Sequence, residues 1–105
     1  MLEKLNEINA LYDVYCDLLT DKQREYMELY YQEDLSLAEI ADEFGVSRNA
    51  VHDNIRRSEN LLISYEEKLK IYEKASIRQV IYDKIRECTN EDAVLGFLKQ
   101  LESME

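Results

Sequence analysis

The absence of proline is the feature of this sequence that most restricts its fold. The chain also has only two glycines, Gly45 and Gly96, among its 105 residues. The tight turns that join the strands of a sheet depend heavily on these two residue types. We therefore predict an all-α protein that forms a single small helical domain over residues 1–105.

The amino-acid composition further restricts the class of protein. Hydrophobic residues make up 46% of the chain, too many for a disordered protein, and no apolar run approaches the roughly 20 residues of a membrane span. The first residues include Glu3 and Glu7 and do not resemble a signal peptide. Cys16 and Cys88 stand far apart, with no neighbouring ligands for a metal site. These features predict a cytoplasmic protein with reduced cysteines.

Apolar residues spaced by three and four positions predict a series of amphipathic helices. We expect the first over 2–19, and a second that Thr20 caps and that ends near Gln32. Ser36 and Glu39 have the spacing of a capping box for a short third helix. Gly45 should end that helix, and Ser47 should cap the fourth. Two C-terminal helices are expected within 76–102, the first capped by Ser76 and the second by Thr89 with Asp92.

The fourth helix is predicted to be long, over 48–73. Its seam repeats in heptads, at Val51, Ile55, Ser58, Leu62, Tyr65, Leu69 and Tyr72. A helix of this length needs a long partner. Either the first helix covers the seam, or a second subunit does, which would make a homodimer through residues 51–72.

Residues 35–57 have the pattern of a helix-turn-helix, in which a second helix presents its outer face to nucleic acid. Ala41 allows close helix approach, and Val46, Val51 and Ile55 should hold the second helix in place. The candidate nucleic-acid-binding residues are then Ser47, Arg48, Asn49, His52, Asp53, Arg56 and Arg57.

The chemistry of these residues fits nucleic acid in part. Arginine binds guanine bidentately, asparagine binds adenine, and a capped helix N-terminus accepts a phosphate. Asp53 could accept only from cytosine, or could instead pair with Arg56 or Arg57. The alternative is that these charges form a solvated helix face.

The charge around the motif limits its use. Residues 20–47 hold two basic and eight acidic residues, a net charge of −6, whereas 48–58 carry +2. The whole chain carries −10. Free DNA would be repelled by such a surface, so useful affinity should require a second subunit or a protein partner.

Several segments of the sequence resemble known proteins. The segments Leu19–Tyr31, Leu35–Ala41 and Val46–Val51 look like region four of the bacterial sigma factors. The longer run Val46–Arg57, with Tyr65–Leu69, resembles the YlxM-type helix-turn-helix proteins of Gram-positive bacteria. In those proteins, glutamine commonly follows the Ser-Arg pair and an aromatic follows the valine, so Asn49 and His52 differ.

The resemblance implies a small helix-turn-helix domain, winged-helix-like or sigma-region-four-like, encoded beside the signal recognition particle GTPase and acting in that pathway. Our first hypothesis is a nucleic-acid-binding regulatory protein. The alternative is an adaptor that binds the RNA or the GTPase of the particle without reading DNA sequence. With His52 as the one histidine and no glycine-rich phosphate loop, we expect no enzyme, catalytic residue, metal or cofactor.

Overall fold

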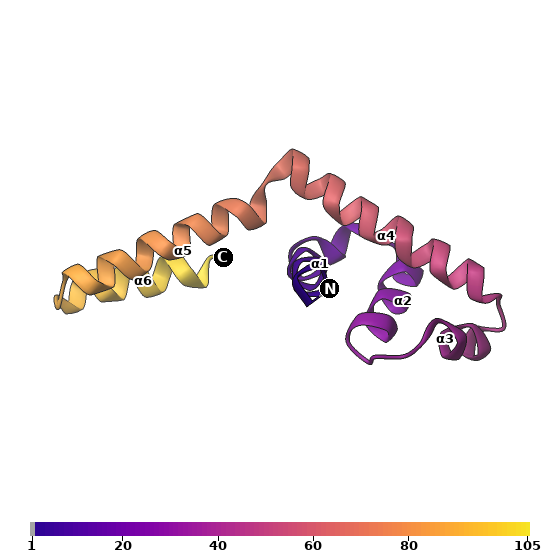
Figure 1. The fold of residues 1–105 in the computed structure, drawn as a ribbon. Helices are drawn as coiled ribbons and strands as arrows, with labels where there is room; N and C mark the ends of the chain where they lie inside the picture. Colours follow the sequence, from indigo (N-terminus) through magenta and orange to yellow (C-terminus); the bar gives the residue numbers. More distant parts are fainter. Residues whose placement is uncertain (1) are drawn as a thin grey trace. The chain divides into compact units, whose positions relative to one another are not determined.

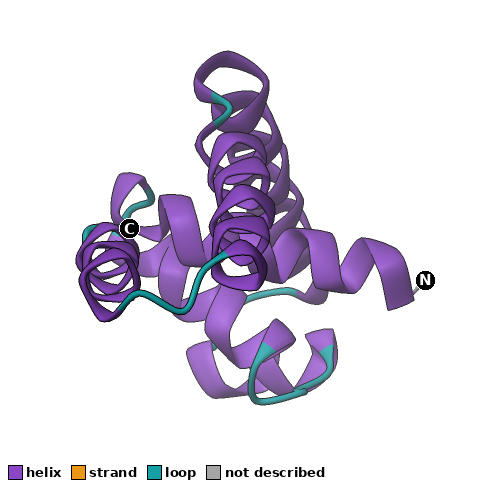
Figure 2. Ribbon diagram, turned by 90° about the vertical axis from the view of Figure 1, so that its left-hand side faces the viewer, coloured by secondary structure: helices purple, strands orange, loops and turns teal. Residues whose placement is uncertain are grey.

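The computed structural model describes residues 2–105, with side chains from Lys4 onward. This range folds into six α-helices and one 3-10 helix, without a strand. Figures 1 and 2 show the helices and the loops that join them. The prediction of an all-α protein is confirmed. The elements are α1 (Leu2–Tyr15), η1 (Cys16–Leu18), α2 (Asp21–Tyr31), α3 (Leu37–Phe44), α4 (Arg48–Leu69), α5 (Ile71–Cys88) and α6 (Asp92–Ser103).

The chain divides into two compact units. The first ends at Leu69 and contains α1 to α4, and the second comprises Lys70–Glu105 and contains α5 and α6.

Local side-chain signals begin α2, α3 and α4 where the sequence places them. Thr20 Oγ1 accepts from the Gln23 N–H at 3.2 Å, and Ser36 Oγ accepts from the Glu39 N–H at 3.1 Å, each in a reciprocal capping box. Ser47 Oγ likewise accepts from the Ala50 N–H at 3.1 Å. These caps fix the short loops between the helices of the first unit.

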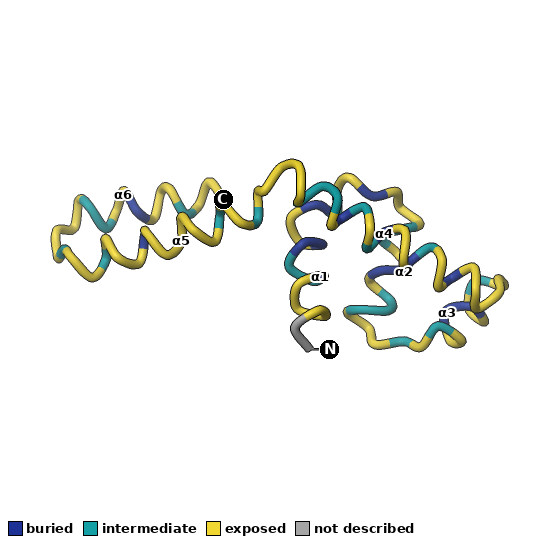
Figure 3. Tube along the Cα trace, turned by 45° about the horizontal axis from the view of Figure 1, so that its top comes forward, coloured by how far each residue is buried: buried dark blue, intermediate teal, exposed yellow. Residues whose placement is uncertain are grey.

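In the first unit, α1, α2 and α3 all pack against α4 (Figure 1). Figure 3 shows buried positions on each of these helices. The core side chains are Ile8, Leu11, Tyr12, Tyr15, Leu19, Tyr26, Met27, Ile40, Ala41, Val51, Ile55 and Leu62. Apolar residues recur at steps of three and four over the first predicted helix, and all are buried except Leu5, which is 39% exposed: Leu5, Ile8, Tyr12, Tyr15 and Leu19.

The seam of α4 closes within the chain over its first four positions. Val51, Ile55, Ser58 and Leu62 are all buried, and the α4 contacts come from α1, α2 and α3. Ser58 tolerates full burial because its hydroxyl donates to the Asn54 carbonyl at 3.0 Å. This part of the seam has no free surface for a second subunit.

Two predicted helix boundaries are wrong. The first helix ends at Tyr15 and continues as the 3-10 turn η1, and the long fourth helix ends at Leu69 instead of residue 73. Lys70 takes a left-handed conformation, with φ of 54°, which breaks the helix although the heptad pattern runs on. A side-chain pattern carries no information on such a backbone reversal at a non-glycine residue.

The second unit is an antiparallel hairpin of two helices, and its predicted caps also differ. Ser76 lies inside α5, where its hydroxyl donates to the Tyr72 carbonyl at 2.9 Å. Glu91, not Thr89, precedes α6 as its N-cap, and Thr89 Oγ1 accepts from the Glu91 N–H at 3.1 Å. Only Tyr82 and Leu98 are buried in this unit.

Polar side chains tie the two helices of the hairpin together. Arg78 pairs with Glu105, and Arg86 pairs with Glu102. The Gln79 amide also donates to Glu102 at 3.0 Å. The hairpin is thus held more by polar contacts than by an internal apolar core.

Candidate nucleic-acid interface

The geometry of α3, its turn and the start of α4 is that of a helix-turn-helix. Gly45 closes α3 in the left-handed conformation, with φ of 65° and ψ of 35°. The next residue, Val46, donates its N–H to the Ala41 carbonyl at 3.1 Å, which completes the helix end. The chain then enters α4 after only three residues.

Burial of the inward side chains sets which face of α4 is free. Val51 and Ile55 are 0% and 3% exposed. Since each residue turns an α-helix by about 100°, Asn49, Asp53 and Arg56 point away from the core, and all three are exposed. Val46, which was expected to hold α4 in place, is instead 38% exposed.

At the start of α4, the N-cap side chain is already hydrogen-bonded, whereas the first backbone N–H groups are free. The Ser47 side chain is engaged as the N-cap, through its contact with the Ala50 N–H. The N–H groups of Arg48 and Asn49 have no intrahelical acceptor, because they begin the helix. Such donors are the usual phosphate ligands at a helix N-terminus.

His52 and Asp53 lie next to each other on the exposed face. Their Nδ1 and Oδ1 atoms are 3.8 Å apart, an ion pair only when the imidazole is protonated. Asp53 makes no ion pair with Arg56 or Arg57 among the residues with described side chains. Of the two alternatives for Asp53, the described side chains therefore do not form the pair with Arg56 or Arg57.

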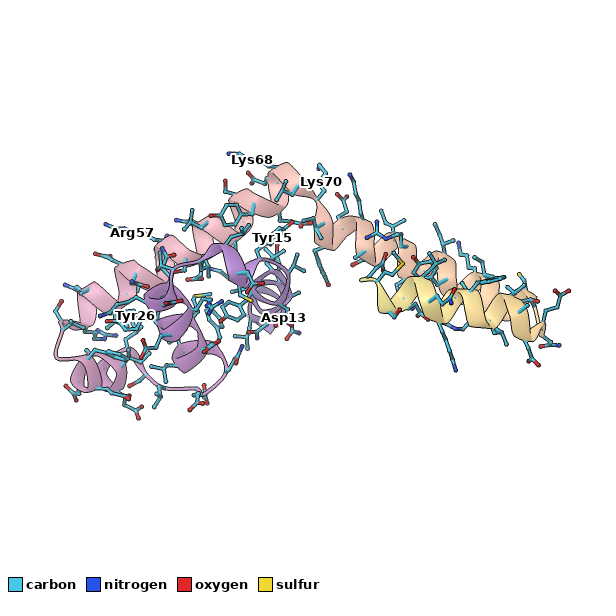
Figure 4. The ribbon with its side chains drawn as sticks, turned by 180° about the vertical axis from the view of Figure 1, so that it is seen from behind. Asp13, Tyr15, Tyr26, Arg57, Lys68 and Lys70 are labelled. Carbon is cyan, nitrogen blue, oxygen red and sulfur yellow. The ribbon has the colours of Figure 1, made fainter. Side chains whose placement is uncertain are left out.

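The six arginines of the chain fall into two groups. Arg24, Arg78 and Arg86 each pair with at least one carboxylate. Over residues 4–105, by contrast, no ion pair involves the three arginines of α4, which are Arg48, Arg56 and Arg57. In Figure 4, Arg57 stands on α4 on the side away from Tyr26, a residue of the core.

The helix that precedes α4, which is α3, carries the opposite charge. Glu39, Asp42 and Glu43 of α3 are all exposed. A first helix of this motif normally crosses the phosphate backbone, where these carboxylates would be repelled. The exposed face of the motif is therefore basic on α4 and acidic on α3.

A groove beside the start of α4 is lined by residues that the sequence analysis did not connect with the helix-turn-helix. Its cavity measures about 420 Å³, and His52 and Arg56 of α4 line it together with Lys4, Tyr30 and other residues of α1 to α3. Lys4 stands 52 positions from Arg56 in the sequence. No local pattern could have joined them.

Tyr31 also lines the groove and anchors its wall. Its hydroxyl donates to Glu59 Oε2 at 2.8 Å, and its ring meets Tyr30 edge to face, with centroids 5.1 Å apart. Burial and then this hydrogen bond raise the pKa of the Tyr31 phenol above its ordinary value near 10. The phenol therefore remains a proton donor at neutral pH.

Membrane-spanning helices and metal clusters are both absent from the described residues. None of their helices is both long and apolar enough to cross a membrane. Nor do they contain a cluster of three or more His, Cys, Asp or Glu side chains arranged to hold a metal ion.

A capped short helix, a glycine turn and a second helix with an exposed basic face define a helix-turn-helix protein. Known proteins agree with this class: residues 2–101 match the model of the UPF0122 family, described as "Putative helix-turn-helix protein, YlxM / p13 like". A UPF0122 protein of Streptococcus thermophilus is 54% identical over 94 residues, covering 90% of this chain and 86% of the relative. One from Streptococcus pneumoniae shows the same identity and coverage. The chain belongs to the UPF0122 family.

Proposed function

We infer that this protein is a nucleic-acid-binding regulatory protein, with the start of α4 as its recognition helix. The observation that carries this proposal is the set of three arginines that pair with no carboxylate of residues 4–105, in a chain whose net charge is −10. Acidic residues outnumber basic residues by 23 to 13, and each of the other three arginines pairs with a carboxylate. A nucleic-acid phosphate can supply the anionic partner that these three arginines lack within the described part of the chain.

The contacts divide by chemistry. Arg48 and the first N–H groups of α4 are placed for phosphate, while Asn49, Asp53 and Arg56 face outward for base edges in a major groove. His52 and Arg57 flank this face on either side. Ser47 is already the N-cap of α4, so its hydroxyl could contribute only one donated hydrogen bond to a phosphate.

Salt dependence provides a quantitative test of this assignment. With Arg48 on phosphate and Arg56 on a base edge, log K should fall with log salt with a slope of about −0.9 per chain on duplex DNA, or about −1.8 when Arg57 also contacts phosphate. We propose fluorescence anisotropy titrations on duplex DNA from the promoter of the protein's own operon, and on a scrambled duplex of equal composition. Preference for the promoter duplex supports sequence reading.

The decisive variant is Arg48→Ala combined with Arg56→Ala. Its salt slope should be less steep by about 0.9 for each phosphate that an arginine no longer binds. Lys68→Ala combined with Lys99→Ala is the matched control, because it removes the same charge from exposed residues that do not belong to the helix-turn-helix segment 35–57. If both double variants change the salt slope equally, the change reflects net charge alone. That result would refute the assignment of phosphate contacts to the arginines of α4.

The acidic face of α3 favours a second candidate function, that of an adaptor on a ribonucleoprotein. Such a partner offers phosphates to the arginines and a basic protein surface to Glu39, Asp42 and Glu43. The resemblance to YlxM-type proteins points to the signal recognition particle, through its RNA or its GTPase. Retention of the purified particle by the immobilised chain, without binding to either duplex, would favour this candidate over DNA reading.

A further inference from the structure

The hairpin of α5 and α6 exposes a row of large apolar side chains. Six of them are between 38% and 82% exposed: Ile77, Ile81, Ile85, Phe97, Leu101 and Met104. Figure 3 shows the hairpin as mostly exposed, with few buried positions. The function proposed for α4 makes no use of this surface.

These side chains share one face of the hairpin. Ile81 and Phe97 each come one residue before the buried residue of their helix, Tyr82 and Leu98. Each is therefore rotated by about 100° from the contact between the helices, in the same sense. In an antiparallel pair, equal rotations bring both residues to the same side.

The opposite face is polar by the same geometry. Asp83 and Lys99 each follow the buried residue of their helix, and both are exposed. The other apolar residues recur at steps of four and three from Ile81 and Phe97, which continues the row along both helices. Val80, also exposed, points away from α6 and lies outside this row. Apart from Val80, the exposed large apolar residues at positions 77–104 lie on one face of the hairpin.

A unit of this kind cannot be stable by itself. It spans 36 residues, Lys70–Glu105, and buries only two side chains. Domains below about 40 residues usually need disulfides, metals or oligomerisation, and both cysteines of the chain are free. The apolar face must therefore be covered for the hairpin to hold its fold.

Charge indicates what covers it. The first unit holds seven basic and sixteen acidic residues, a net charge of −9, so two such units repel each other. The hairpin holds six basic and seven acidic residues, a net charge of −1. Two copies of the chain can meet at the hairpin with little electrostatic cost.

The available area is sufficient. Six half-exposed side chains offer roughly 60 Å² of apolar surface each, or about 360 Å² per hairpin. A pair would bury roughly 1,100 Å² in total, if about 65% of the interface is apolar as in homodimers. Specific interfaces exceed about 1,000 Å².

We propose that the hairpin is a homodimerisation element, in which two copies pack these apolar faces together as a four-helix bundle. The occupant of the face is a second copy of the chain. The dimer would carry two recognition helices, and its formation does not depend on what those helices bind.

The test is the mass of the full-length protein in solution, measured by light scattering after size exclusion over a series of micromolar concentrations. The wild type should be a dimer. The variant Ile81→Glu with Phe97→Glu should dissociate about 100-fold more readily, because two carboxylates per chain would enter the bundle. The control, Val14→Glu with Leu18→Glu, makes the same change at exposed apolar residues of the first unit and should remain dimeric.

Hydrogen exchange of the wild type removes any dependence on how the variants fold. Amides of α5 and α6 should become more protected as concentration rises, while those of α1 to α4 should not change. A monomer at high micromolar concentration would overturn the proposal, as would protection of the hairpin that is independent of concentration. Dissociation by the control pair alone would place the interface elsewhere and overturn it equally.

Discussion

Replacing each glycine by alanine should change stability in opposite directions. Gly45 has a positive φ of 65° and Gly96 lies inside α6, and a Cβ added at either would meet nothing within 4 Å. Steric clash with neighbours is thus excluded at both sites. The backbone conformation alone decides the sign.

The magnitudes follow from that conformation. At Gly45, an L-residue in the left-handed region costs about 1–2 kcal/mol, offset by about 0.4–1 kcal/mol from a less flexible unfolded chain. We expect Gly45→Ala to destabilise the first unit by about 1 kcal/mol. Gly96→Ala should stabilise α6 by about 0.8–1 kcal/mol, the difference in helix propensity.

The assay is hydrogen exchange read by mass spectrometry, because it reports α3 with its turn and α6 separately. Chemical denaturation followed by circular dichroism gives the global change. Gly45→Asn is the control, since asparagine tolerates the left-handed region better than alanine and should lose less stability. Equal signs for the two alanine variants, or a neutral Gly45→Ala, would refute the reasoning.

Three further changes test the first unit by denaturant titration. Leu62→Ala should cost about 2–5 kcal/mol, because Leu62 is fully buried and a cavity would remain; a loss below about 1 kcal/mol would contradict the closed seam. Asn54→Ala should stabilise by about 1 kcal/mol, since Asn54 Oδ1 is buried without a hydrogen-bond partner; destabilisation would show that this oxygen is satisfied. Burial and hydrogen bonds to carboxylates raise the phenol pKa of Tyr12 and Tyr31. The contribution of these two phenols to the free energy of unfolding is complete below about pH 10 and is lost as the pH rises further. Tyr31→Phe should therefore flatten the loss of stability at alkaline pH, and an unchanged pH profile would contradict this role of Tyr31.

Local chemistry explains which parts of the fold could be predicted. The caps at Thr20, Ser36 and Ser47 and the turn at Gly45 depend on residues a few positions apart, and the structure confirms all four. Periodicity likewise identified most of the core. The break at Lys70 could not be found this way, because it is a backbone conformation that no side-chain pattern encodes.

The candidate interface shows the same division. The outward direction of Asn49 and Arg56 follows from the helical repeat and the burial of Val51. The groove that Lys4 and Arg56 both line depends on how α1 packs on α4, which sequence spacing does not contain. The missing ion pairs of the arginines also required coordinates, since Asp53 had the right spacing to form one.

The two thiols give this protein a built-in pair of spectroscopic labelling sites. Cys16 belongs to the first unit and Cys88 to the hairpin, and both are free. Cys88 is exposed while Cys16 is only partly accessible, so a donor dye can be attached to Cys88 first and an acceptor to Cys16 afterwards. Energy transfer between them would report the distance between the two labelled units before and after nucleic acid is added, without any engineered cysteine.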